Sequence, residues 1–236
     1  ELNAVQKNLG NQNIDIVHLA DAPVNNDEKQ RAMMELLSSI VITAFSMARP
    51  TLTAWASAKT SNISLQYGPN DISAYGYANY GVNVAITQLE DYKTAHRFGR
   101  LAIALADRFD NPVVRSRSYF TFADNINHWQ APLVLNIDYY RRAHQAGVEG
   151  GELSFATYAA QRLVMTQLAV GRNLDDVQAE AEGLAPFIKR SFPRFQDQYL
   201  DPGISETLAA LRGEDEQRKI LTFVENDDQL RSGMFY

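Results

Sequence analysis

The chain has 236 residues, of which 45% are hydrophobic and 21% charged, so it is long enough to bury a sizeable core and disorder is not indicated. Its net charge of −6 argues against nucleic-acid binding, and its lack of cysteine excludes disulfides, cysteine-ligated zinc and thiol catalysis. No apolar run reaches the roughly 18 residues of a membrane span and no signal peptide opens the chain, so we expect a cytoplasmic protein.

Apolar residues recur at intervals of three and four, which predicts amphipathic helices. The first long helix follows Asn26, Asp27 and Glu28, a polar and acidic start that suits a helix N-terminus. A later helix is expected to run from Pro132 to Gly147. Other helix boundaries are marked by proline, glycine and capping residues at 49–50, 68–71, 90–91, 111–112, 150–151 and 171.

The last part of the chain has a weaker pattern. A short helix is expected near Ile204–Leu211, followed by a charged helix that ends near Arg231. In total we expect about ten helices joined by tight loops, and no strand. The β-branched run at residues 40–43 lies inside a helical stripe and is interpreted as helix.

Paired helices recur with a spacing near 40 residues, close to that of known helical repeats: 50–88, 91–128 and 132–170. Small residues at Gly81, Ala85, Ala95 and Ala102 suit the close packing of a tetratricopeptide (TPR) unit. The predicted fold is therefore all-α, with antiparallel helix pairs stacked as a TPR-like right-handed α-solenoid. We expect a single domain over residues 1–236, with atypical ends at 1–20 and 200–236.

The search for catalytic chemistry is negative. The sequence contains neither a P-loop nor a nucleophile elbow. No two of the four histidines have metal-ligand spacing, and the paired carboxylates fall at helix starts or on polar faces. We therefore expect no catalytic residue, no metal site and no cofactor in this chain.

Two sets of aromatic and asparagine residues are more informative. Their members are Tyr77, Tyr80 and Asn83 in one helix and Asn127, His128 and Trp129 at the end of another. One interpretation places them on a concave face, where they would bind a peptide or a small molecule. The other makes the aromatic residues interhelical core and the asparagines helix caps. Trp129, shortly before Pro132, is expected to lock the turn.

Several short motifs follow one another in a fixed order: ADAP at residues 20–23, ARP at 48–50, NISLQYG at 62–68, SAYGYANYG at 73–81, FGRLA at 98–102, HW at 128–129 and GVEGGEL at 147–153. Together they resemble the helical region that follows the ATPase module in bacterial multi-sensor signal-transduction kinases. Those proteins join a Ser/Thr-kinase-like domain, an AAA/STAND-type ATPase, this TPR-like region, a GAF sensor and a histidine kinase. The resemblance extends over roughly residues 15–190 and transfers no catalytic residue.

The resemblance implies that the chain is a fragment of a larger multidomain protein. Our first hypothesis is a non-catalytic scaffold or regulatory module that relays signals between an ATPase switch and a downstream kinase. Its partners would be neighbouring domains or a protein or peptide segment, with neither nucleic acid nor membrane involved. The alternative is a sensor that binds a small molecule or peptide on its concave face. The sequence predicts no oligomeric state.

Overall fold

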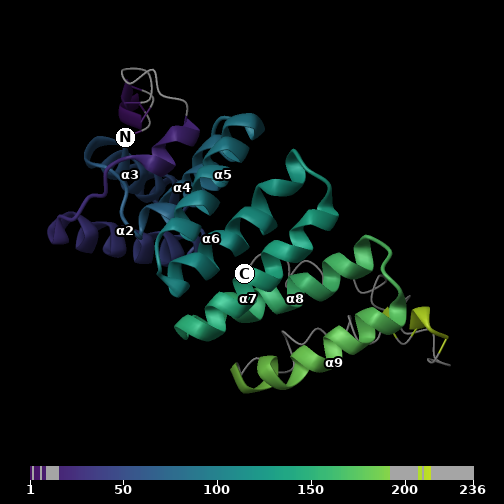
Figure 1. Cartoon of the computed structure of the whole chain (residues 1–236). Helices are drawn as coiled ribbons and strands as arrows, with labels where there is room; N and C mark the ends of the chain where they lie inside the picture. The colour runs from purple at the N-terminus through teal and green to yellow at the C-terminus, as the bar shows by residue number, and fades with distance from the viewer. Residues whose placement is uncertain (2, 6, 9–15, 192–206, 209, 214–236) are drawn as a thin grey trace. The chain divides into compact units, whose positions relative to one another are not determined.

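The computed structural model describes residues 1, 3–5, 7–8, 16–191, 207–208 and 210–213 (Figure 1). In these ranges every regular element is helical and no strand forms, which confirms the all-α class. Only residues 207–208 and 210–211 of the short helix expected near Ile204–Leu211 are described, and they are helical. The charged helix expected up to Arg231 lies outside the described residues. Stacking into a right-handed solenoid remains a prediction.

The chain forms two compact units, residues 1–159 and 160–236. The elements of the first unit are the 3-10 helix η1 (Ile16–Asp21), α2 (Glu28–Ser46), α3 (Pro50–Tyr67), α4 (Ser73–Tyr80), the π-helical η2 (Gly81–Ile86), α5 (Tyr92–Arg108), α6 (Pro112–Asn125), the 3-10 helices η3 (Asn127–Trp129) and η4 (Leu133–Leu135), and α7 (Asn136–Gly150). The helix α8 (Leu153–Ala169) contains the boundary, and α9 (Leu174–Ser191) belongs to the second unit. Helices adjacent in the sequence pack together, as α2 with α3, α4 with α5 and α6 with α7.

Three helices of the first unit, α2, α5 and α6, begin where their capping residues predict. The Asp27 side chain accepts hydrogen bonds from the backbone N–H groups of residues 29 and 30, and Asp91 caps α5 through Thr94. Asn111 caps α6 through Val114, with a proline at the first helical position. These carboxylates and amides satisfy backbone donors that have no partner inside the helix.

The expected end of α7 at Gly147 is wrong. The helix continues to Gly150, and Gly151 ends it with a φ of 71°. Gly147 serves packing instead: a Cβ there would lie 2.7 Å from Oγ of Ser116 and 2.8 Å from Cβ of Ala156. The start of the helix also differs, because residues 133–135 form a separate 3-10 helix before α7 begins at Asn136.

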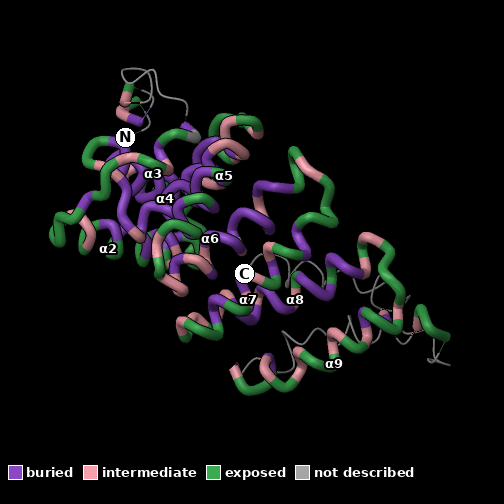
Figure 2. The backbone as a smooth tube through the Cα atoms, in the orientation of Figure 1, coloured by how far each residue is buried: buried purple, intermediate pink, exposed green. Residues whose placement is uncertain are grey.

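The core of the first unit surrounds α4, which is buried at all eight of its residues (Figure 2). The small residues expected at close contacts lie in this core: Ala95 and Ala102 have no exposed surface, and a Cβ on Gly81 would lie 3.1 Å from the backbone oxygen of Ala95. Large fully buried side chains fill the remaining space, among them Tyr77, Phe98, Leu101, Leu105, Tyr119 and Phe122.

The second unit has a smaller apolar cluster. Val164, Val177 and Leu208 are buried together, and half-buried leucines of α8 and α9 pack against them. Gln167 also donates a hydrogen bond to Glu180, which joins α8 to α9. Throughout the described part of the chain, no helix combines the length and apolar character needed to cross a membrane.

Candidate functional site

The first predicted set lies mainly inside the protein. Tyr77 and Tyr80 are 1% and 2% exposed, and their rings lie 5.7 Å and 4.6 Å from the ring of Phe98. Burial raises the pKa of both tyrosines, because the ionised phenolate is disfavoured away from water. These two side chains therefore pack α4 against α5 and do not reach solvent.

Asn83 is half-buried and is used in an interhelical contact. Its Nδ2 atom donates to Oγ of Ser57, 3.1 Å away on α3, and to Oδ1 of Asn79, 3.3 Å away on α4. Asn83 lies in the π-helical turn of η2, and such turns are rare within helices. The contact joins η2 to α3.

The first residue of the second set is buried, and the two residues that follow it are exposed. Asn127 is 3% exposed, and its Oδ1 lies 3.4 Å from Nε2 of His96. Its Nδ2 donates to Oδ1 of Asn136 at 2.6 Å, and Asn136 in turn donates to the backbone oxygen of Ala123 at 2.7 Å. Burial lowers the pKa of His96, and this effect outweighs the contact with Asn127 that favours its charged form.

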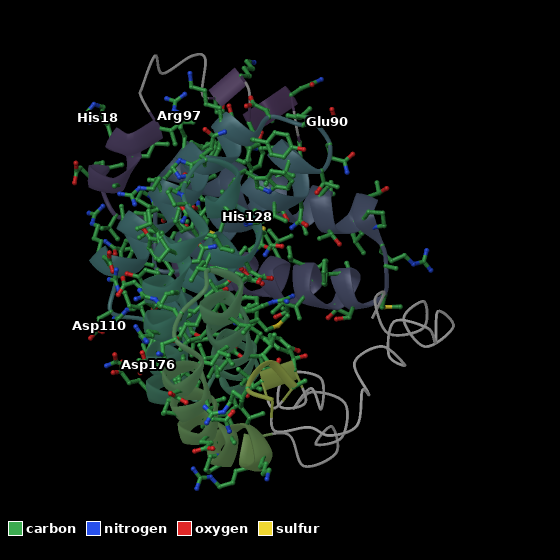
Figure 3. All side chains as sticks on the ribbon, turned by 90° about the vertical axis from the view of Figure 1, so that its right-hand side faces the viewer. His18, Glu90, Arg97, Asp110, His128 and Asp176 are labelled. Atoms are coloured by element: carbon green, nitrogen blue, oxygen red, sulfur yellow. The ribbon has the colours of Figure 1, made fainter. Side chains whose placement is uncertain are left out.

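His128 and Trp129 follow directly and are exposed, Trp129 at 51%. The Trp129 ring lies 4.6 Å from the ring of Tyr92 and 5.1 Å from that of His128, which is labelled in Figure 3. Its Nε1 donates to the backbone oxygen of Asn125 at 3.1 Å, so Trp129 locks the turn as expected. We call Tyr92, His128 and Trp129 the aromatic corner.

Further exposed apolar side chains occur in the segments next to the corner residues in the sequence. They are Leu89 before α5 and Leu133, Val134 and Leu135 in η4. Sequence reasoning missed Tyr92, because nothing local indicates that its ring lies beside that of Trp129. Exposed aromatic side chains that contact one another, as the rings of the corner do, are typical of protein interaction sites.

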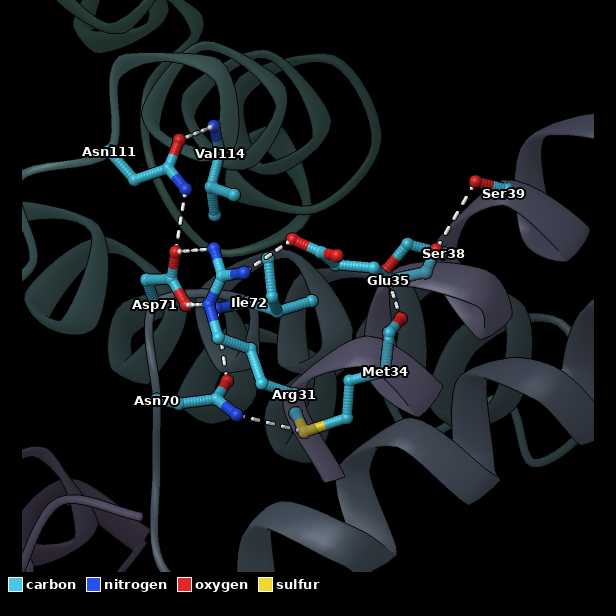
Figure 4. A network of polar contacts seen from close by, with 10 residues as sticks. All are labelled: Arg31, Met34, Glu35, Ser38, Ser39, Asn70, Asp71, Ile72, Asn111 and Val114. Atoms are coloured by element: carbon cyan, nitrogen blue, oxygen red, sulfur yellow. Dashed lines mark hydrogen bonds and ion pairs between the residues drawn. The ribbon is translucent and has the colours of Figure 1, made fainter. Parts of the chain in front are cut away.

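A second feature of the first unit is a polar network at the start of α4 (Figure 4). Nε and Nη2 of Arg31 donate to the two carboxylate oxygens of Asp71 at 2.9 Å and 2.7 Å. Nδ2 of Asn111 donates to Oδ2 of Asp71 at 2.7 Å. Burial opposes ionisation of Asp71, but the hydrogen bonds from Arg31 and Asn111 outweigh it and lower the pKa of this carboxyl. The network joins α2, the start of α4 and the start of α6.

Beside this network lies a cavity of about 330 Å³ between α2, α4 and α6. Its polar lining comes from Glu35, Ser38, Ser39, Asn111 and Arg117. Arg117 donates from Nε to Glu152 at 2.7 Å, and its guanidinium lies over the rings of Tyr75 and Phe155 at 5.8 Å and 5.7 Å. None of the six predicted site residues lines this cavity.

Among the residues that the structure describes, no three His, Asp or Glu side chains form a cluster that could hold a metal ion. His18 and His128, both labelled in Figure 3, lie on η1 and η3 respectively.

Comparison with known proteins gives one informative similarity. Over 136 residues, or 56% of the chain, the sequence is 23% identical to "Hybrid signal transduction histidine kinase G" of Dictyostelium discoideum. The matched region is 4% of that protein, so the chain corresponds to a small part of it. No family model and no solved structure matches the chain. The similarity supports a signal-transduction kinase context, whereas the TPR-like repeat and the bacterial origin remain predictions.

Proposed function

We propose that this chain is a non-catalytic, TPR-like regulatory module of a cytoplasmic signal-transduction kinase, and that it binds a neighbouring domain or a partner protein through the aromatic corner. The observation that carries the proposal is the exposed Trp129 ring packed on Tyr92. The resemblance to multi-sensor kinases and the similarity to a histidine kinase both agree with this context.

The corner is built as a rigid anchor. Trp129 is held by its ring contact with Tyr92 and by its hydrogen bond to the backbone of Asn125. Directly before it, Asn127 is fixed in the buried chain of hydrogen bonds with His96 and Asn136. Because these contacts already order the Trp129 side chain, it would lose little further conformational entropy when a partner binds. Tryptophan and tyrosine are also the residues that most often dominate binding energy at interfaces.

The surroundings favour a protein partner over a small ligand at the corner. Exposed leucine and valine side chains also occur in the segments that neighbour the corner residues in the sequence. Small ligands are usually bound in concave pockets that bury most of their surface. The one cavity described above has none of the corner residues in its lining.

Tryptophan fluorescence provides a direct test. The chain has two tryptophans, so Trp55→Phe leaves Trp129 as the only one, and Trp55 is itself 45% exposed and tolerant of this change. The ATPase and histidine-kinase domains of the parent protein would be titrated separately into this variant. We expect a saturable blue shift of the Trp129 emission with one of them.

A matched pair of variants separates binding from folding. Trp129→Ala should abolish capture of that domain and alter autophosphorylation of the parent kinase, whereas Val148→Ala, at a 47% exposed position on α7, should change neither. Unchanged emission with both domains, together with unchanged autophosphorylation in Trp129→Ala, would overturn the proposal.

The cavity beside α2 favours a second candidate function, that of a small-molecule sensor. Its volume of about 330 Å³ is at the lower end of the range for ligand sites. Its polar lining combines the Glu35 carboxylate and the Arg117 guanidinium, which also pairs with Glu152, with serine hydroxyls and an amide. A thermal-shift screen with small carboxylates and phosphates tests this candidate. A ligand at 100 times its dissociation constant would add about 2.7 kcal/mol to the stability. The Ser38→Val variant should lose that gain.

A further inference from the structure

The cavity between α2, α4 and α6 has one charged side chain of each sign in its lining. Glu35 comes from α2 and Arg117 comes from α6. The other residues that line the cavity are neutral. These two groups therefore set the charges that a ligand in the cavity would meet, and each of them keeps hydrogen-bonding capacity that the protein does not use.

The Arg117 guanidinium is held in place but keeps one amino group for a ligand. Its Nε donates to Oε2 of Glu152 at 2.7 Å, and its Nη2 donates to the same oxygen. The rings of Tyr75 and Phe155 lie 5.8 Å and 5.7 Å from the guanidinium carbon. Within the described part of the chain, Nη1 makes no hydrogen bond. A carboxylate is the acceptor that a guanidinium N–H binds most strongly, and the side chain is already ordered to receive it.

The Glu35 carboxylate keeps one oxygen. Its Oε1 accepts from Nη1 of Arg31 at 2.8 Å, whereas Oε2 has no donor among the described residues (Figure 4). One turn further along α2, Ser38 and Ser39 donate their hydroxyls to the backbone oxygens of Met34 and Glu35 at 2.9 Å and 3.2 Å. Because each hydroxyl hydrogen is used in this way, the serine oxygens are left as acceptors. Acceptors of this kind suit an ammonium group, which can only donate.

The charges around the cavity favour a ligand that carries an ammonium. The two guanidinium groups, Arg31 and Arg117, pair with three carboxylates, which are Glu35, Asp71 and Glu152. This paired set has one negative charge in excess. A ligand with a carboxylate or phosphate alone would add to the excess, whereas a ligand that also carries an ammonium would not.

The buried part of the lining is largely apolar. Glu35 and Ser39 are exposed, whereas Ile72, Tyr75 and Val114 are buried. Buried side chains of this kind form a wall that suits a hydrocarbon group, as in most small-molecule sites. The volume of about 330 Å³ limits the ligand to a small one.

We propose that this cavity binds a small zwitterion of the amino-acid class with an apolar side chain. Its carboxylate accepts from Nη1 of Arg117, its ammonium donates to Oε2 of Glu35, and its side chain packs on Ile72 and Val114. This inference rests on the second candidate function proposed above, the small-molecule sensor, and names the ligand class of that site. It does not depend on the aromatic corner.

Isothermal titration calorimetry and thermal unfolding of the whole chain test the ligand class. The probes are α- and β-amino acids with apolar side chains, and we expect at least one of them to bind saturably and to raise the Tm. Its deaminated and decarboxylated analogues should each bind about tenfold more weakly or worse, because each loses one charge-assisted hydrogen bond. For leucine these analogues are 4-methylpentanoate and 3-methylbutylamine.

Two substitutions assign the two ends of the ligand. Glu35→Gln should weaken binding of the amino acid by about tenfold, and it should not weaken binding of the deaminated analogue, which has no ammonium. Arg117→Lys keeps a positive charge beside Glu152 but removes Nη1, so it should weaken the amino acid and the deaminated analogue alike. The control Glu28→Gln, at an exposed position on α2 outside the cavity lining, should bind as the natural chain does. Circular dichroism of each variant verifies that the helices are intact.

The outcomes separate this inference from the sensor function itself. If a carboxylate or phosphate without an ammonium binds as tightly as any amino acid, the cavity is a ligand site but the zwitterion inference is wrong. If neither those compounds nor the amino acids bind, both the sensor function and the inference are wrong. Equal weakening of the amino acid and its deaminated analogue by Glu35→Gln would also overturn the inference.

Discussion

The two aromatic sets of this chain have similar residue types but opposite environments. Tyr77 and Tyr80 lie on α4, which other helices cover on every side, and they are almost completely buried. His128 and Trp129 lie in η3, directly after α6, and they are exposed, with the Trp129 ring against that of Tyr92. The difference teaches that the position of the element in the fold, and not the residue type, decides whether an aromatic side chain is buried or exposed.

The largest expected effect concerns the buried set. Tyr77→Ala should destabilise the protein by about 3–5 kcal/mol, because it removes a large side chain from a packed core and leaves a cavity. Tyr67→Ala, at a 51% exposed position at the end of α3, should cost less than about 1 kcal/mol. Denaturant unfolding of both variants measures the contrast. Equal losses would show that the two environments do not differ as described.

The buried support of the aromatic corner should have an intermediate effect. Asn127→Ala removes the donor to Oδ1 of the buried Asn136 and the contact with Nε2 of His96, which should cost about 1–3 kcal/mol. A double-mutant cycle with Asn136→Ala should give a clear coupling energy, because the two amides are 2.6 Å apart. Additive effects of the two substitutions would contradict a shared network. Asn26→Ala, a substitution of an exposed asparagine, serves as the control.

A smaller effect is expected from pH. Burial lowers the pKa of His96 in the folded state below its ordinary value of 6.5, so the unfolded chain binds this proton more readily. Stability should therefore fall as the pH drops below 6.5 and should level off below the folded-state pKa. Chemical unfolding between pH 7.5 and pH 5 measures this loss, as an ordinary histidine titrates in that range. His96→Gln should remove the His96 part of the pH dependence, and an unchanged profile would count against the prediction.

The smallest effect on stability is expected at the exposed set. Trp129→Ala removes a half-exposed ring that contacts mainly Tyr92 and His128, so the loss should be about 1 kcal/mol or less. The same variant should have the largest effect on partner binding, which the fluorescence titration measures. A large loss of stability would show that Trp129 is a packing residue like Tyr77, and the two sets would then not differ.

The candidate site could be predicted only in part. The sequence singled out His128 and Trp129, but it grouped them with Tyr77, Tyr80 and Asn83, because all five occur in clusters of aromatic and amide residues. It did not indicate Tyr92, which begins α5 and is separated from Trp129 in the sequence by the rest of α5 and by α6.

The sequence by itself determined the helical class and the starts of the main helices. Asp27, Asp91 and Asn111 cap backbone groups within three residues, so the information is local. Only the tertiary structure decided which aromatic residues are exposed, why Gly147 lies inside a helix, and that Arg31 and Asn111 share the carboxylate of Asp71. In that network the partners are 40 residues apart, and no local pattern specifies a contact made when separate helices pack together.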